Sequence, residues 1–353
     1  MRKIIFLIIL KFIICNVNKN NSKIILNQKN EIYDSSKFSK SYNFSKYINK
    51  LSPKKNVLLG IIVNYSWGKI LPFIKSLNNA HLINSDIIMF ISGLTKSVIN
   101  NLKSFGIIVY NIPNRFKDVQ HIYNDRWRIY QDFLNNNKNK YNLVLSVDIK
   151  DTIFQNEFFS IYENYSDILG FSFEELTLEN SNNKYWIIEK FGNDSFKKIK
   201  NKRVINAGTI WGTINTFIEF SSILYKNLLM YPEALDQSVV NYLIYNENIL
   251  GNCKKISSDE YGPVITLGLT NRKNIVLDTK NNILNYNGQI ASIIHQYDRH
   301  PDIKKIIKEK YCPELIRNKF IIHFFIILEL FTFILFIKSK IILFIINFII
   351  QFF

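Results

Sequence analysis

Cysteine is scarce in this sequence: 353 residues contain three, and one of them, Cys15, lies in the N-terminal leader. The remaining two, Cys253 and Cys312, are too few for the dense disulfide framework of a small secreted scaffold. An oxidising compartment would allow a disulfide between them, but two cysteines this far apart indicate it only weakly. The 47% of hydrophobic residues supports a substantial hydrophobic core instead.

Acidic residues are also few, 28 against 45 basic ones, which leaves a formal net charge of +17. Such a charge usually suggests a polyanionic partner such as nucleic acid or an anionic membrane. Here the lysines are spread along the chain, form no stripe and accompany no nucleic-acid motif. We therefore predict that nucleic acid is not a partner. The sequence also contains no internal repeat.

The two ends of the chain differ from its middle. Residues 1–17 have a basic start and an apolar run, as in a signal peptide or signal anchor. Residues 18–55 are polar and lack periodicity, which is typical of a stem or linker. Residues 319–353 are strongly apolar, and their first run has the length of a short membrane span. We predict one or more membrane segments in residues 319–353, and a buried hydrophobic helix is the alternative. For the whole protein we predict a location in the membrane of the secretory pathway (ER or Golgi), with the central domain in the lumen.

Between these ends, apolar runs alternate with amphipathic stretches. Alternation of strands and helices predicts an α/β fold, with a mostly parallel sheet and helices on both of its faces. Ligands of such folds bind at the carboxyl ends of the strands. The expected strands are 57–63, 86–92, 107–112, 143–147, 167–173, 184–191 and 204–212. The expected helices follow the first two strands and also cover 126–134, 217–229 and 235–246.

The stretch LSVDIKDTIFQ, residues 145–155, places Asp148 directly after the fourth expected strand, with Asp151 three residues later. Haloacid-dehalogenase-like phosphatases open with a strand and D-x-D-x-T, and in that interpretation Asp148 is a nucleophile. Their second aspartate is replaced here by Lys150, which cannot serve as general acid and base. The motif also follows the fourth strand instead of the first. A third interpretation makes the two aspartates the N-cap and first-turn carboxylate of a helix.

Four segments, in order, resemble a eukaryotic group of glycosyltransferases with the A-type, nucleotide-diphospho-sugar transferase fold. VDIKDTIFQNEFF resembles their D-x-x-D-x-x-F-Q segment, and VINAGTIWGT resembles their N-x-G strand. ALDQSVVNYLIY resembles their D-Q helix, and LNYNGQIASIIHQYDRHPDI resembles their closing H-Q-Y-D-R segment. The resemblance covers about residues 57–303, and we predict a catalytic domain over residues 56–318. The resemblance implies an enzyme that moves a sugar from a nucleotide-diphosphate donor to a protein, lipid or glycan acceptor, with Mn²⁺ or Mg²⁺ as cofactor.

The resemblance further implies roles for single residues. A divalent cation, which would neutralise the charge developing on the diphosphate, would be held by Asp148, Asp151 and His295. Because the motif is D-x-x-D and not D-x-D, one aspartate could instead bind ribose or sugar hydroxyls. Donor contacts are expected from Asn64, Arg126, Asp148, Asn206, Gly208, Gln237 and Arg299. Catalytic roles are expected for Asp236 and Asp151, and an inverting enzyme could use Asp236 or Glu174 as its base.

Each of these residues also has a purely structural explanation. His295 could be a buried structural histidine, Arg126 a solvated helix residue and Gly208 a strand bulge. Asp236 could merely cap a helix, and Arg299 could form a surface pair with Asp298 or Asp302. For the whole chain, the matching alternative is a catalytically inactive relative that binds a glycan or a partner at the membrane.

Overall fold

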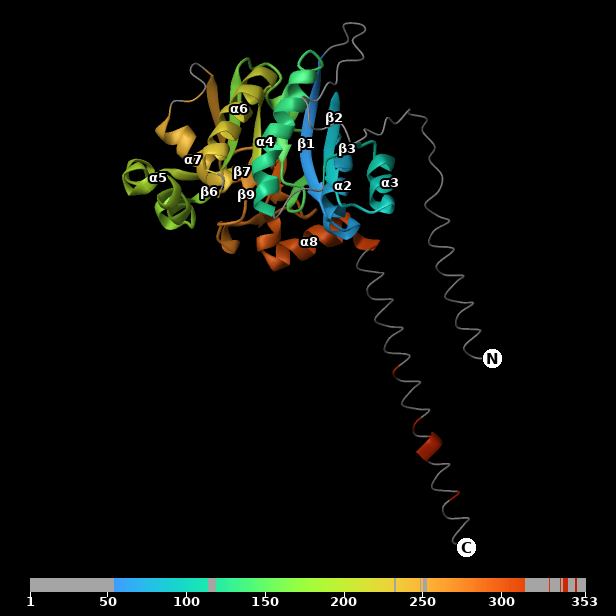
Figure 1. The fold of residues 1–353 in the computed structure, drawn as a ribbon. Coiled ribbons are helices and arrows are strands. Elements are labelled where there is room, and N and C mark those ends of the chain that lie inside the picture. Colours follow the sequence, from blue (N-terminus) through green and yellow to red (C-terminus); the bar gives the residue numbers. More distant parts are fainter. Residues whose placement is uncertain are drawn as a thin grey trace. The chain divides into compact units, whose positions relative to one another are not determined.

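The computed structural model describes residues 54–314 apart from 114–118, 232, 248 and 250–252, together with a few isolated positions beyond 314. The expected leader, nearly all of the expected stem and most of residues 319–353 lie outside this description, so their assignments stay predictions. Within the described residues, no helix combines the length and the apolar character needed to span a bilayer. The described part is an α/β domain (Figure 1).

A seven-stranded sheet in the order β3-β2-β1-β4-β7-β6-β8 forms the centre of the domain. Neighbouring strands are parallel except at β7, which is antiparallel to both β4 and β6. The predicted mostly parallel sheet is therefore confirmed. Its strands are β1 (Lys55–Val63), β2 (Ser85–Ser92), β3 (Ile108–Asn111), β4 (Tyr141–Val147), β6 (Ile168–Thr177), β7 (Arg203–Thr213) and β8 (Lys254–Ser258).

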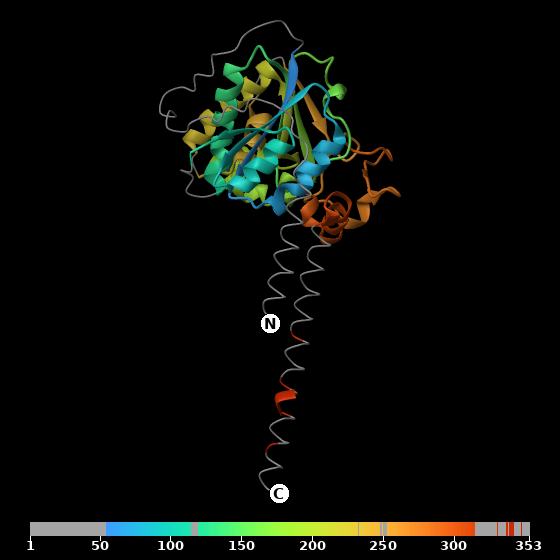
Figure 2. The ribbon, with the colours of Figure 1, turned by 90° about the vertical axis from the view of Figure 1, so that its right-hand side faces the viewer.

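Helices cover both faces of this sheet (Figures 1 and 2). Side chains alternate along β1: Val57 and Leu59 pack in the same core as α4, α6 and α7, whereas Leu58 and Ile62 pack with α2 and α3. The predicted coverage of both faces is confirmed. The helices are α2 (Trp67–Ala80), α3 (Lys96–Ser104), α4 (Val119–Asn136), α5 (Asn183–Ile199), α6 (Ile214–Met230), α7 (Asp236–Asn246) and α8 (Pro301–Tyr311).

A smaller sheet of three strands, in the order β5-β12-β9, brings distant segments together. Strand β12 is antiparallel to β5, with His295 opposite Thr152, and parallel to β9. This pairing returns the end of the domain to the segment that directly follows β4. The three strands are β5 (Thr152–Phe154), β9 (Val264–Thr266) and β12 (Ile293–His295); a separate hairpin pairs β10 (Val276–Leu277) with β11 (Ile283–Leu284).

Two expectations about local structure are wrong. Residues 184–191 belong to helix α5, which is kinked at Gly192, and not to a strand. Ile187 from this segment is buried with Phe196 and Ile199 from beyond the kink. A short apolar run does not distinguish the two on its own. The aspartates of residues 145–155 do not begin a helix either, since strand β5 follows them. Both described cysteines are free.

Candidate metal centre and adjoining cavity

Three predicted metal ligands meet at the carboxyl end of β4. Asp148 follows β4, and its backbone N–H donates to the Gly208 carbonyl of β7 at 2.8 Å. Asp151 immediately precedes β5, and the β5–β12 pairing brings His295 beside it. The Nε2 atom of His295 lies 3.7 Å from Asp148 Oδ2 and 3.6 Å from Asp151 Oδ1. One ligand atom from each residue lies within 4.8 Å of the others.

This arrangement fits a divalent cation. Two ligands bound about 2.1 Å from one ion lie roughly 3.0 to 4.2 Å apart, depending on the angle between them, and the two distances to His295 fall in that range. His295 is 0% exposed, and neither ring nitrogen has a hydrogen-bond partner within the described part of the chain. A buried imidazole whose nitrogens form no hydrogen bond costs free energy unless something binds it. Two carboxylates and an imidazole are suitable ligands for Mn²⁺ or Mg²⁺.

Each aspartate directs one oxygen toward His295 and the other toward an arginine. Asp148 Oδ1 accepts a hydrogen bond from Arg126 Nη1 at 2.6 Å, and Asp151 Oδ2 lies 3.3 Å from Arg299 Nη1. Only Oδ2 of Asp148 and Oδ1 of Asp151 then face the imidazole. The geometry therefore favours monodentate use of both aspartates over a division in which only one of them contacts the ion.

Opposing charges shift the pKa values at this centre. Burial on its own would lower the pKa of His295, but the negative charges of Asp151 and Asp148 outweigh it and raise that pKa. For Asp151, burial opposes ionisation, yet His295, Arg299 and Lys150 together lower its pKa. The centre thus favours a carboxylate at Asp151 and additional positive charge at the imidazole, whether from a proton or from a cation.

Gly208 leaves the space that this centre needs. A Cβ at this position would lie 2.3 Å from Cε1 of His295 and 2.6 Å from Oδ2 of Asp148. No real Cβ contact is that short, so any larger residue would displace one of the two ligands. Gly208 also lies where the register of β7 against β6 shifts between Asn206 and Ile210. The bulge and the close approach of the β7 backbone therefore both favour glycine at this position.

Arg126 is buried and held by two carboxylates. It is 4% exposed, and its Nη2 donates to Asp236 Oδ2 at 2.6 Å and to the Ala207 carbonyl at 3.0 Å. Burial opposes the charged guanidinium, but Asp236 and Asp148 raise its pKa. The alternative of a solvated helix residue is wrong. Asp236 also accepts from Trp127 Nε1 at 3.1 Å, and burial, followed by the charge of Asp148, raises its pKa despite Arg126.

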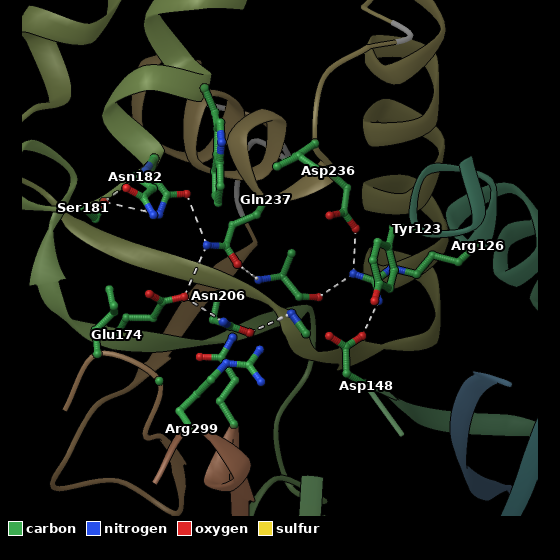
Figure 3. A pocket seen from close by; sticks show the side chains of 18 residues that line it. Tyr123, Arg126, Asp148, Glu174, Ser181, Asn182, Asn206, Asp236, Gln237 and Arg299 are labelled. Atoms are coloured by element: carbon green, nitrogen blue, oxygen red, sulfur yellow. Dashed lines mark hydrogen bonds and ion pairs between the residues drawn. The ribbon is translucent and has the colours of Figure 1, made fainter. Parts of the chain in front are cut away.

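Asp236 is not a helix cap. The N-cap position of α7 is occupied by Leu235, and Asp236 is the first residue of the helix. Its carboxylate instead reaches the Arg126 guanidinium from the opposite side to Asp148 (Figure 3). The structural alternative based on capping is therefore wrong for this residue.

A cavity of about 300 Å³ adjoins the metal centre (Figure 3). Seven of the predicted site residues line it: Arg126, Asp148, Asn206, Gly208, Asp236, Gln237 and Arg299. Asn64 does not. It follows β1 in a left-handed conformation with φ of 56° and is exposed. The proposed contact of Asn64 with a donor therefore has no support from the cavity.

Hydrogen bonds connect the three side chains that form the floor of the cavity, Glu174, Asn206 and Gln237. Asn206 Nδ2 donates to Glu174 Oε1 at 2.8 Å, and Gln237 Nε2 donates to the same oxygen at 3.2 Å. Gln237 Oε1 in turn accepts from the Ala207 N–H at 3.3 Å. Glu174 is 4% exposed, and burial raises its pKa even though these amides oppose the shift. The three side chains come from β6, β7 and α7, so the floor depends on all three elements.

Sequence reasoning missed one wall of the cavity. This wall is formed at the start of α5 and in two neighbouring segments, by Ser181, Asn182, Asn183, Trp186, Leu269 and Gln296. The apolar run at 184–191 predicts a strand, so the sequence indicates no helix start facing the site. The cluster of polar residues at 180–183 before the apolar run is the signal that would have indicated a helix start.

Comparisons with known proteins give matches among solved structures. No protein-family model matches this chain, and no curated protein matches it in sequence. Among solved structures, 252 chains match. One of them is an active-site mutant of LgtC, a glycosyltransferase, which covers 68% of this chain and 86% of its own chain at 12% identity and a TM-score of 0.44. A match of this strength assigns no role to any residue.

Proposed function

We propose that this protein is a metal-dependent glycosyltransferase, which moves a sugar from a nucleotide-diphosphate donor to a protein, lipid or glycan acceptor. The observation that carries the proposal is the convergence of Asp148, Asp151 and His295 beside a polar cavity. These residues come from separate segments, their ligand atoms lie within 4.8 Å, and the imidazole has no other described partner. The order of the four sequence segments discussed above supports the same reaction class.

The side chains around the cavity have distinct tasks in this proposal. When bound, Mn²⁺ or Mg²⁺ would neutralise the negative charge that develops on the departing diphosphate. Arg299 is 44% exposed by side chain and lies 3.3 Å from Asp151, so it can approach a diphosphate bound at this centre. Arg126 is committed to Asp148 and Asp236, and we assign it the task of holding these carboxylates in place. Asp236 faces the donor sugar, where it can accept hydrogen bonds from hydroxyls.

The predicted location in the membrane of the secretory pathway accompanies this proposal. It depends on residues 1–17 and 319–353, and it stays a prediction. The expected lumenal placement of the central domain would give the enzyme access to nucleotide sugars and to secreted or membrane-bound acceptors.

A thermal-shift screen tests the proposal. The full chain is heated with UDP- and GDP-sugars, with and without Mn²⁺, because a ligand at 100 times its Kd stabilises the folded state by about 2.7 kcal/mol. We expect a shift that needs both donor and metal, and no such shift for Asp148→Ala. The matched control is Asp194→Ala, whose side chain is 92% exposed in an ion pair and does not line the cavity.

The screen also separates the enzyme from the inactive relative. Metal-dependent donor binding together with release of free sugar, and loss of both in Asp148→Ala, supports a transferase. Donor binding that is equal with and without metal, or unchanged in Asp148→Ala, would contradict the proposal.

A further inference from the structure

The cavity has two ends with different chemistry. At one end Asp148 adjoins the metal centre, and Arg126 and Asp236 stand next to it. At the other end lie Ser181 and Asn182, which Figure 3 places across Gln237 and Asn206 from Asp148. In the proposed function, the donor diphosphate, its metal and the donor sugar beside Asp236 lie at the first end. The second end is open for another molecule.

Glu174 lies between these two ends, and only one of its two carboxylate oxygens accepts hydrogen bonds from described residues. Its Oε1 accepts from Asn206 and Gln237 at 2.8 and 3.2 Å. Its Oε2 accepts no hydrogen bond from any described residue. The ring nitrogens of His295 are fully buried, whereas Oε2 of Glu174 is accessible from the cavity. In Figure 3 Glu174 lies on the side of Ser181, whereas Asp236 lies on the side of Arg126 and Asp148. Of the two carboxylates that could act as a base, Glu174 is the one directed to the open end.

The wall at the open end suits a sugar. Trp186 of α5 lines the cavity and is half-buried, so one part of its indole is available for contact. Asn182 beside it is exposed, and its amide can both donate and accept hydrogen bonds. The indole can contact the C–H face of a pyranose, and the amides can bind its hydroxyls. Together they can orient a small polar ligand that has one apolar face.

We propose that the half of the cavity between Glu174 and Trp186 is the acceptor subsite, that the acceptor group bound there is a saccharide, and that Glu174 receives the proton of its attacking hydroxyl. This inference rests on the proposed transferase function. A bond forms between the acceptor oxygen and the anomeric carbon, and the bond from that carbon to the diphosphate oxygen breaks. The electron pair of the broken bond leaves with the diphosphate, and the acceptor proton passes to Oε2 of Glu174.

The first experiment removes the base and keeps the hydrogen bonds. In Glu174→Gln, the side-chain oxygen can still accept from Asn206 and Gln237, so a purely structural role would be preserved. We expect the kcat for transfer to fall about 10²- to 10⁴-fold, which is the usual contribution of a general base. The thermal shift with UDP or GDP and Mn²⁺ should remain. The matched control is Glu175→Gln, because Glu175 lies outside the cavity and accepts from Asn271 and Asn274.

The second experiment tests the saccharide wall and does not depend on Glu174. With the donor identified by thermal shift, transfer is measured to methyl glycosides of glucose, galactose and N-acetylglucosamine, and to serine- and threonine-containing peptides. We expect transfer to a glycoside, and about a tenfold higher acceptor KM for Trp186→Ala with an unchanged donor KM. Tyr185→Ala is the matched control, because Tyr185 is the adjacent residue on α5, is 68% exposed and does not line the cavity.

The outcomes separate this inference from the proposed function. If the unmodified protein binds no donor with metal, the proposed function fails and this inference falls with it. If it binds donor and transfers sugar, but Glu174→Gln keeps its rate within threefold of the unmodified protein, Glu174 is not the base. If peptides accept sugar and glycosides do not, or if Trp186→Ala leaves the acceptor KM unchanged, the saccharide subsite is wrong.

Discussion

Replacing Arg126 by methionine tests the buried ion network that holds the site. Arg126 pairs with Asp148 and Asp236 at 2.6 Å each, and the side chains of Arg126 and Asp236 are only 5% and 8% exposed. Removal of one partner from a buried pair typically costs about 3–5 kcal/mol, because the other charge is left without compensation. The lost hydrogen bond to Ala207 adds about 1 kcal/mol. Asp148 is 29% exposed and can be rehydrated, which offsets about as much as the lost Ala207 hydrogen bond adds, so we expect a total loss of about 3–5 kcal/mol.

Urea unfolding of the metal-free protein, followed by tryptophan fluorescence, measures this loss. Lys197→Met is the control: its pair with Asp194 is exposed on both sides, and no measurable change is expected. The double variant Arg126→Met with Asp236→Asn removes the uncompensated charge and should recover at least about 1 kcal/mol of the loss. A loss below about 1 kcal/mol for Arg126→Met, or a double variant as unstable as the sum of its parts, would refute the reasoning. If Arg126→Met does not fold, the double variant still provides the comparison.

Three further predictions concern the metal centre and a remote ion pair. Gly208→Ala should abolish the stabilisation by metal, because the new Cβ overlaps His295 and Asp148. For the unmodified protein this stabilisation is about 2.7 kcal/mol when the metal concentration is 100 times its Kd. A metal titration by thermal shift that gives an unchanged Kd for Gly208→Ala would contradict this. EDTA should lower the Tm of the metal-loaded unmodified protein and leave the Tm of Gly208→Ala unchanged, as measured by calorimetry. Asp86→Asn should lose roughly 1.5–3 kcal/mol at pH 7, since Asp86 accepts from Tyr141 at 2.9 Å and pairs with two lysines. Burial opposes ionisation of Asp86, but these partners lower its pKa below 3.8. The ionised carboxylate therefore stabilises the folded state above that pH, and this contribution should disappear as the pH falls further. Urea unfolding from pH 7 to pH 3 can follow the loss.

Local patterns were sufficient for the first half of the domain. The buried runs at residues 57–63 and 86–92 correspond to β1 and β2, and the run at 143–147 lies within β4. Each is a continuous apolar run of strand length between polar segments, which is typical of a strand inside a covered sheet. The position of Asp148 after β4 follows from the same pattern.

Local patterns failed where a segment has more than one compatible structure. The run at residues 184–191 is apolar enough for a strand, but it forms the first part of α5, and Ile187 is buried with Phe196 and Ile199 from the part of α5 beyond the kink at Gly192. Strands of two or three residues, such as β5 and β12, are too short to show a period. Their pairing, and with it the position of His295, depends on contacts between segments far apart in the chain.

The sequence by itself therefore determined the α/β class, the position of Asp148 at a strand end and a set of polar residues that could form a site. The class and the strand end follow from the local spacing of apolar and polar residues. The set of site residues follows from the resemblance of four segments to a glycosyltransferase family. Only the tertiary structure decided that Arg126 is held by two carboxylates, that each aspartate directs one oxygen to His295, and that Glu174 faces the open end of the cavity. Hydrogen-bond partners and burial are properties of neighbours in space, and the spacing of residues along a chain does not specify them.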